Sequence, residues 1–412
     1  MDKRAKESET TVPSYENMYK YANGLVRRGV NLQPGQMLYI EAPTEHEYFV
    51  SIVAKAAYDA GASNVGVVWK SDLLDLVKLS QPEMPENTLL PCDYDVVDYF
   101  AGKGAAFLRL ESPNLTTFAN VPADRIQKKA VADREIRVRY GKLAQGAGQS
   151  IAAVPSAGWA KAVFPDLPEQ QAVEKLWDCV LSCTRCMEPD PIAAWDEFIR
   201  RTNERKRILN EKKYVTFHYK SAKTDLMMSP IDDQSWGGGC IEVPGGKVYT
   251  PNVPTEEVFT VPHKYKVNGV VCSTMPLNFR GKIVDDFRLV LKDGKVVEYS
   301  AAVGEDILRS ILETDEGSCY FGEMALVDQR SPIARQGVIF YNTLYDENAS
   351  CHIALGLAGA RGGMTDEERE AKGINHSILH VDFMVGSDDM SIRGQKQDGT
   401  WEDVFVNGRW AW

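Results

Sequence analysis

The sequence has few cysteines, few histidines and a deficit of positive charge, and it contains no long hydrophobic run. Eight cysteines in 412 residues are too few for a disulfide framework and fit reduced thiols. The formal net charge of −11 argues against nucleic-acid binding, because neutralising phosphates requires a basic surface. No stretch approaches the ~18 apolar residues of a membrane-spanning helix. The first eleven residues, MDKRAKESETT, lack the apolar segment of a secretory signal, so we expect a cytoplasmic protein.

Glycine motifs of nucleotide-binding proteins are also missing, and no nucleotide cofactor is expected. The segment WGGGC (236–240) has no P-loop lysine, and the first half has no GxGxxG. Cys179, Cys183 and Cys186 have the spacing of one helix face without a matching second CxxC pair. This pattern predicts a buried apolar stripe rather than a metal site.

The first half alternates between helix and strand patterns. Residues 15–29 and 45–61 have helical periodicity, whereas MLYIEAP (37–43) and NVGVVWK (64–70) are typical of strands. This order predicts βαβ units and a parallel sheet covered by helices. We therefore predict a Rossmann-like N-terminal α/β domain, residues 1–210.

The second half changes to β-rich segments separated by tight-turn dipeptides. Gly245-Gly246, Asp293-Gly294, Asp398-Gly399 and Asn407-Gly408 supply the positive φ that a hairpin turn needs. We predict a mainly antiparallel β C-terminal domain with helices, residues 211–412. One of those helices is expected in NTLYDENASCHIALGLAG (342–359), capped by Asp346 or Asn348, with His352 in its opening turns.

Histidines and carboxylates gather in this second half, in a pattern that suits a metal site. His380 and Asp382 are two residues apart in a strand-like segment, so they project from one face. Imidazole nitrogen and carboxylate oxygen are ligands for zinc, cobalt or manganese. Glu323 precedes an apolar run and is costly to bury unless it is paired or coordinated. Glu256 and Glu257 are adjacent, so only one of them can easily face a given site.

Four segments together resemble the dinuclear metallo-aminopeptidases of the aminopeptidase T, aminopeptidase S and PepS type. They are PNVPTEEVFTVP (251–262), YFGEMALVD (320–328), YNTLYDENASCHIALG (341–356) and HVDFMVGS (380–387). The resemblance implies removal of N-terminal amino acids from short peptides by a homodimer with two divalent ions. Zinc or cobalt would be the ions, with manganese or magnesium as alternatives. The implied metal ligands are Glu257, Glu323, His352, His380 and Asp382.

The role of the two adjacent glutamates stays open at this point. Motif alignment gives Glu257 as the ligand, with Glu256 as its rival. If Glu257 binds metal, Glu256 is the candidate for a catalytic base that moves the proton of an attacking water.

One position departs from the family pattern. Typical members have a tyrosine seven residues after the motif histidine, where this chain has Gly359. Loss of a donor that stabilises the tetrahedral intermediate usually costs on the order of 10²–10³ in rate. The alternatives are therefore a family member with weak or no peptidase activity, or a different metal-dependent reaction, such as another hydrolysis or ring opening by a mononuclear iron dioxygenase.

Overall fold

The computed structural model describes residues 13–83, 89–113, 117–118, 120–279, 282–359 and 364–412. The chain divides into two compact units. The first unit comprises the chain up to Glu197 together with Cys240–Pro254, and the second comprises Phe198–Gly239 and Thr255–Trp412. This division differs in detail from a single boundary after residue 210. Helix α8 (Pro191–Lys212) continues through that position, and a later segment returns to the first unit.

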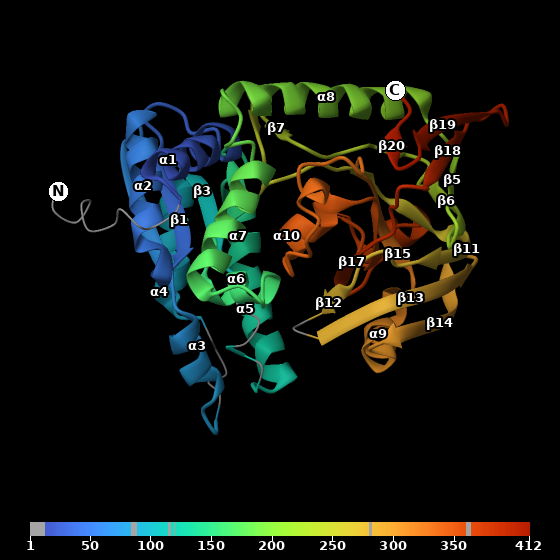
Figure 1. Ribbon diagram of the computed structural model, residues 1–412, viewed down its shortest axis with the longest axis horizontal. Coiled ribbons are helices and arrows are strands. Elements are labelled where there is room, and N and C mark those ends of the chain that lie inside the picture. The colour runs from blue at the N-terminus through green and yellow to red at the C-terminus, as the bar shows by residue number, and fades with distance from the viewer. Residues whose placement is uncertain (1–12, 84–88, 114–116, 119, 280–281, 360–363) are drawn as a thin grey trace. The chain divides into compact units, whose positions relative to one another are not determined.

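The first unit contains a parallel sheet with the strand order β2-β1-β3-β4-β9, as its βαβ pattern predicts. Helices lie on both sides of the central strands (Figure 1). The ring of Tyr39 in β1 is tilted against Phe100, and the ring of Phe107 in β3 stacks on Tyr140, with centroids 5.2 and 4.8 Å apart. The strands of this unit are β1 (Met37–Pro43), β2 (Asn64–Lys70), β3 (Ala106–Glu111), β4 (Gln149–Ala153), β7 (Ile241–Val243), β8 (Lys247–Tyr249) and β9 (Asn252–Val253).

Several helices of the first unit begin at serine side chains that accept a hydrogen bond from the first turn. Ser14, Ser71 and Ser156 do so at α1, α3 and α6. The predicted helix over residues 15–29 ends in a π-helical turn, Leu25–Gly29. The α-helices are α1 (Tyr15–Gly24), α2 (Glu47–Asp59), α3 (Asp72–Leu79), α4 (Pro91–Gly102), α5 (Ala123–Leu143), α6 (Ala157–Val163) and α7 (Glu169–Cys183), and a 3₁₀ turn covers Thr44–His46.

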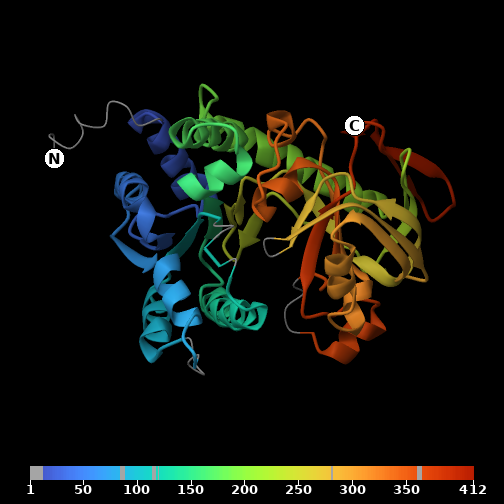
Figure 2. The same cartoon turned by 60° about the horizontal axis from the view of Figure 1, so that its bottom comes forward.

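The second unit is mainly antiparallel β, and its strands form curved sheets (Figure 2). The larger sheet has the order β12-β13-β11-β6-β5-β18-β19-β20, with β14 paired to β13, and the smaller has the order β10-β15-β16-β17. The larger sheet contains β5 (Thr216–Lys220), β6 (Asp225–Pro230), β11 (Pro262–Cys272), β12 (Leu277–Phe279), β13 (Lys282–Lys292), β14 (Lys295–Val303), β18 (Ser391–Gln395), β19 (Trp401–Val406) and β20 (Arg409–Trp410). The smaller contains β10 (Val258–Thr260), β15 (Phe321–Leu326), β16 (His352–Gly356) and β17 (His380–Met384).

Short helices connect these strands, and predicted turns join several of them. Asp293-Gly294 and Asn407-Gly408 have positive φ at both residues, which tight antiparallel connections favour. Thr365 and Glu368 form a capping box at the start of the helix over residues 366–371. The helices are α9 (Glu305–Leu312), α10 (Thr343–Asp346) and α11 (Asp366–Ala371), with 3₁₀ turns at Glu316–Cys319, Ala334–Gln336 and Glu347–Ala349.

The predicted helix around His352 is wrong. The helix α10 is capped by Asn342 and ends at Asp346, and His352 begins strand β16. Asp346 accepts hydrogen bonds from the backbone N–H groups of Phe340 and Asn342 instead of capping a following helix. The physical reason is that every residue of β16 is buried between neighbouring strands. A strand covered on both faces has a continuous apolar run, which periodicity cannot distinguish from a buried helix.

No helix in the described part of the chain combines the length and apolar character that crossing a membrane requires.

Candidate metal centre

The smaller sheet of the second unit aligns the predicted ligands across three strands. Glu323 of β15 pairs with Ala354 of β16, and Ala354 pairs with Asp382 of β17. His380 pairs with Gly356, which also lies in β16. Because Ala354 and Gly356 are small, the side chains of the two outer strands can approach each other above the middle strand.

Alternation along the strands separates these polar residues from the hydrophobic core. Ile353 of β16 and Val381 and Phe383 of β17 belong to the core cluster of the second unit. Their neighbours His352, His380 and Asp382 therefore project from the opposite face. The predicted same-face arrangement of His380 and Asp382 agrees with this register, and their Nε2 and Oδ1 atoms lie 3.3 Å apart.

The ligand atoms form two groups that share one carboxylate. The first group is Glu257, Glu323 and His352, and the second is Glu323, His380 and Asp382; in each, the possible ligand atoms lie within 4.8 Å of one another. In the first group, His352 Nε2 lies 3.2 Å from Glu257 Oε2 and 3.7 Å from Glu323 Oε1. The structure thus brings together all five residues that the resemblance implies as ligands.

Backbone carbonyls orient both imidazoles. Nδ1 of His352 lies 3.2 Å from the carbonyl of Ser350, and Nδ1 of His380 lies 2.7 Å from the carbonyl of Leu357. A proton on Nδ1 satisfies each carbonyl and leaves Nε2 to face the carboxylates. This is the usual arrangement of a metal-binding histidine, whose second nitrogen donates to a protein acceptor.

Burial makes the negative charge of this cluster costly. Burial raises the pKa of Glu323, and His352 opposes that rise. Burial lowers the pKa of His380, but the Asp382 carboxylate more than offsets it and raises the value to about 10. Burial likewise lowers the pKa of His352, but the Glu257 and Glu323 carboxylates outweigh it, so this pKa lies well above that of an ordinary histidine. The carboxylates therefore require nearby positive charge, from protonated imidazoles or from bound cations.

Two buried oxygens provide a test of whether this donor set fits a cation. Among the described residues, neither Glu257 Oε2 nor Asp382 Oδ1 receives a hydrogen bond, although each lies close to an imidazole nitrogen. Buried carboxylate oxygens are normally satisfied. Oxygens and nitrogens that converge without hydrogen-bond geometry are what a metal site requires, and the mixture of imidazole and carboxylate suits a divalent transition metal.

Only one of the two adjacent glutamates joins the cluster, and both precede strand β10. Glu257 belongs to the first ligand group, whereas Glu256 is in neither group. The charge of Glu256 is one of several that act on Arg205, a half-buried guanidinium whose Cζ lies 4.9 Å from the ring centroid of Trp410. The backbone N–H of Glu256 donates to Asn348 Oδ1 at 2.7 Å.

A further carboxylate, Glu347, was missed by the sequence analysis. It lies in the 3₁₀ turn before β16 and interacts electrostatically with Asp382, Glu257, His352 and Glu323. Burial raises its pKa well above that of an ordinary glutamate, and Asp382 and Glu257 add to the rise. The only sequence signal was an acidic residue five positions before His352, and the expected helix cap accounted for that acidic turn without requiring a role for Glu347.

Gly359 lies at the edge of the cluster. A Cβ atom built on Gly359 would lie 3.8 Å from Glu323 Oε2, which is an ordinary contact distance. The position that carries a tyrosine in typical relatives therefore adjoins the shared carboxylate.

The remaining candidate motifs have structural explanations. Cys179, Cys183 and Cys186 are buried, as the predicted apolar stripe requires, but α7 ends at Cys183, so Cys186 lies beyond the expected helix face. In the WGGGC segment, a Cβ on Gly238 would lie 2.2 Å from the carbonyl oxygen of Glu257. Gly238 also has a φ of +121°, so glycine allows this segment to pack against the backbone that carries a ligand.

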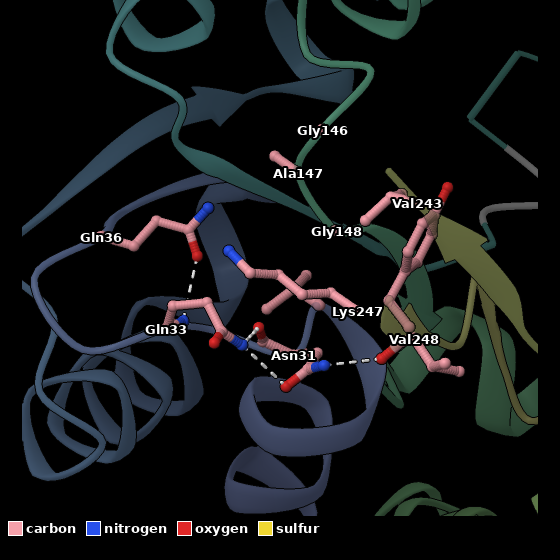
Figure 3. A pocket seen from close by; sticks show the side chains of 11 residues that line it. Asn31, Gln33, Gln36, Gly146, Ala147, Gly148, Val243, Lys247 and Val248 are labelled. Carbon is pink, nitrogen blue, oxygen red and sulfur yellow. Dashed lines mark hydrogen bonds between the residues drawn. The ribbon is translucent and has the colours of Figure 1, made fainter. Parts of the chain in front are cut away.

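A separate pocket lies in the first unit, where Asn31 and Gln33 are linked by hydrogen bonds (Figure 3). Asn31 also donates to the carbonyl of Val248. Lys247 lines the same pocket, whose volume is about 210 Å³ including space open to solvent. The amide donors there are largely used by the protein itself, so the pocket offers few free polar groups to a ligand.

Comparisons with known proteins match nearly the whole chain. A family model described as thermophilic metalloprotease (M29) matches residues 14–410. Aminopeptidase 2 of Geobacillus stearothermophilus is 40% identical over 402 residues, which cover 95% of this chain and 97% of that protein. Aminopeptidase AmpS of Bacillus subtilis (strain 168) is 38% identical over 405 residues, covering 96% and 98%. The structure of wild-type AmpT from Thermus thermophilus has a TM-score of 0.86 and 35% identity, covering 96% of this chain and 99% of that one.

Proposed function

Because the chain belongs to the metalloprotease family M29, we propose that it hydrolyses the first peptide bond of short peptides with the help of two divalent metal ions. The chain is a metallo-aminopeptidase by its family and its relatives. The observation that carries the two-ion proposal is that both ligand groups contain Glu323. A carboxylate can bind one ion through each oxygen, and paired ions ~3.5–4 Å apart occur in aminopeptidases.

Glu257 and His352 would hold one ion, His380 and Asp382 the other, and Glu323 would bridge them. The support is the convergence of their oxygen and Nε2 atoms on the face of the sheet opposite the core. Imidazole and carboxylate ligands favour zinc or cobalt, with manganese or magnesium as alternatives. When bound, such ions polarise the scissile carbonyl and lower the pKa of a water toward ~7.

The protein's own residues fix ligand orientation and exclude water. The carbonyls of Ser350 and Leu357 hold each imidazole with Nε2 toward the carboxylates. His352 is 1% exposed, so a group reacting beside it is largely removed from bulk solvent. Electrostatic interactions within such a site are stronger than in water.

Proton transfer requires a carboxylate that is near the cluster without being a ligand. Glu256 is the candidate from the sequence, but its charge acts on Arg205. Glu347 interacts with four of the five proposed ligands. We therefore favour Glu347 over Glu256 as the group that takes the water's proton and passes it to the leaving amine.

Substitution by glutamine separates these two roles. Metal-loaded Glu347→Gln should lose about 10²–10⁴-fold in kcat, the usual contribution of a general acid or base. Glu256→Gln with full metal content should stay within a few fold of the wild type. The opposite order, with Glu256→Gln inactive and Glu347→Gln active, would return the role to Glu256.

Two finer properties complete the proposal, and only the first of them comes from the family resemblance. They are a homodimer and a cytoplasmic location, and sedimentation and cell fractionation test them. Ring opening by a mononuclear iron centre is not favoured, because the matching family is a metalloprotease and the named relatives are aminopeptidases.

Cleavage of paired peptides tests the proposed reaction. The metal-loaded enzyme should release leucine from Leu-Gly-Gly, whereas the N-acetylated peptide should resist cleavage because an aminopeptidase acts at a free N-terminus. Glu323→Gln serves as the control for a contaminating peptidase, since its activity should disappear. Internal cleavage of the acetylated peptide, or no cleavage of either peptide with the metal sites filled, would contradict the proposal.

A further inference from the structure

Asn348 is a fully buried amide between two segments of the metal centre. Its Oδ1 accepts a hydrogen bond of 2.7 Å from the backbone N–H of Glu256. Its Nδ2 donates to the carbonyl of Leu344 at 3.1 Å and contacts Glu347 Oε1 at 3.4 Å. A single side chain therefore connects the strand entry that carries Glu257 to the turn that carries Glu347, although these segments are 92 residues apart.

The backbone of Asn348 is itself held in place. Its carbonyl accepts a hydrogen bond from Ser331 Oγ at 3.0 Å. A buried amide with partners on both its oxygen and its nitrogen has little freedom to rotate, because turning it would leave polar atoms unsatisfied. Asn348 is thus a rigid spacer rather than a side chain that happens to be nearby.

The strand entry at Glu257 is also packed from another segment. Gly238 approaches the carbonyl of Glu257 so closely that a Cβ would lie 2.2 Å from the oxygen. The chain at Gly237 and Phe259 forms a β-bridge with hydrogen bonds of 2.9 and 3.1 Å. The backbone of Glu257 is therefore held in place by its neighbours. Because Asn348 bonds to this backbone segment and to Glu347, it also restricts the position of Glu347.

We propose that Asn348 is a positioning residue, which sets the Glu347 carboxylate relative to the metal-ligand Glu257. The proposal rests on the proposed function, since it assigns the orientation of the carboxylate that moves the proton. The Nδ2 group directs Glu347 through Oε1, and Oδ1 anchors the amide to the strand entry. The long contact at Oε1 fits a catalytic hydrogen bond that shortens when substrate binds.

Asn348→Asp separates these two functions because it changes few atoms. An oxygen remains to accept from the Glu256 N–H, so the ligand Glu257 stays in place. The donor toward Glu347 is replaced by a second oxygen, which repels the carboxylate. We expect two metal equivalents, an unchanged visible spectrum of the cobalt-loaded enzyme, an unchanged KM, and a kcat lowered about 10–100-fold, as for residues that orient catalytic groups.

Two further variants show whether the effect passes through Glu347. In a Glu347→Gln background, Asn348→Asp should lower the residual kcat by less than about twofold, because residues that act through one another are not additive. Asn342→Ser is the matched control at the neighbouring helix: Asn342 caps α10 by accepting from the Leu344 N–H, and serine can retain that cap. Its kcat should stay within about twofold of the wild type.

The outcomes distinguish this inference from the proposed function. If the metal-loaded wild type does not hydrolyse peptides, the proposed function fails. If the wild type is active and Asn348→Asp has the same kcat, the positioning role is refuted. Metal loss in parallel with activity, or a full additional loss in the Glu347→Gln background, would refute it too by showing a purely structural role. Should Asn348→Asp fold poorly, Asn348→Ser removes both contacts while the Gly237–Phe259 bridge still holds the strand entry, so the same fall in kcat is expected with both metals retained.

Discussion

Glu323→Gln should release both metal ions, whereas Glu257→Gln should release one. Glu323 belongs to both ligand groups and Glu257 to one. Replacing even a partner that only orients a ligand costs about 10–100-fold in metal affinity, so losing a ligand's charge should cost at least about 100-fold, or ~2.7 kcal/mol, per ion. For Glu323→Gln this penalty applies to two ions, about 5.5 kcal/mol in total.

Equilibrium dialysis with metal analysis measures the difference. At free zinc about tenfold above the wild-type Kd, the wild type should hold about 1.8 ions per chain, Glu257→Gln about 1 and Glu323→Gln about 0.2. The metal-free Glu323→Gln protein should also be more stable than the metal-free wild type, because burial disfavours the charge of this carboxylate. Equal metal loss in the two variants would refute a shared ligand, and so would a single remaining ion in Glu323→Gln.

Three other changes test separate parts of the account. Gly359→Tyr places a phenol next to the shared carboxylate and should raise kcat, by up to about 10²–10³; Gly359→Phe, which lacks the hydroxyl, should not raise it. Ala354→Val adds bulk between Glu323 and Asp382 on the middle strand, and its metal affinity should fall at least tenfold by dialysis. Ile353→Val, on the core face of the same strand, should cost about 0.5–1.5 kcal/mol of stability and leave metal affinity unchanged. Burial lowers the pKa of His46 to about 4, so stability present above pH ~6.5 should be lost as pH falls toward 4, by up to about 3 kcal/mol. His46→Gln should flatten that part of the curve of unfolding free energy against pH.

Each of these has a contradicting result. Equal rates for the tyrosine and phenylalanine variants would remove the hydroxyl from the explanation of the family pattern. Normal metal affinity in Ala354→Val would mean that the middle strand does not need a small residue for the ligands to converge. An unchanged pH dependence in His46→Gln would show that this histidine does not contribute to acid destabilisation.

Local sequence patterns predicted much of the fold because they depend on interactions between residues that are close in the sequence. The βαβ order of the first half and the turn dipeptides of the second both have short-range causes, namely periodicity and positive φ. The two-residue spacing of His380 and Asp382 likewise predicted a shared face, since side chains alternate along a strand. Where burial was set by distant strands, the same reasoning failed: β16 is buried on both faces and was taken for a helix.

The ligand set was predicted only through the family resemblance, and the residues around the ligands could not be predicted from the sequence. Nothing in the local sequence around Glu323 reveals that Ala354 lies between it and Asp382, because strand register is a long-range property. Asn348 was interpreted as a possible helix cap, and Glu347 beside it was not singled out. Their contacts reach residues 92 positions away, as the bond from Glu256 to Asn348 shows.

The most direct test of the central claim is a titration of the metal-free enzyme with zinc or cobalt, measuring bound metal and the release of leucine from Leu-Gly-Gly in the same samples. The two overlapping ligand groups predict that activity rises until about two ions are bound per chain and then remains constant. Activity that saturates at one bound ion would contradict the two-ion site, and a fully loaded enzyme that releases no leucine would contradict the peptidase reaction.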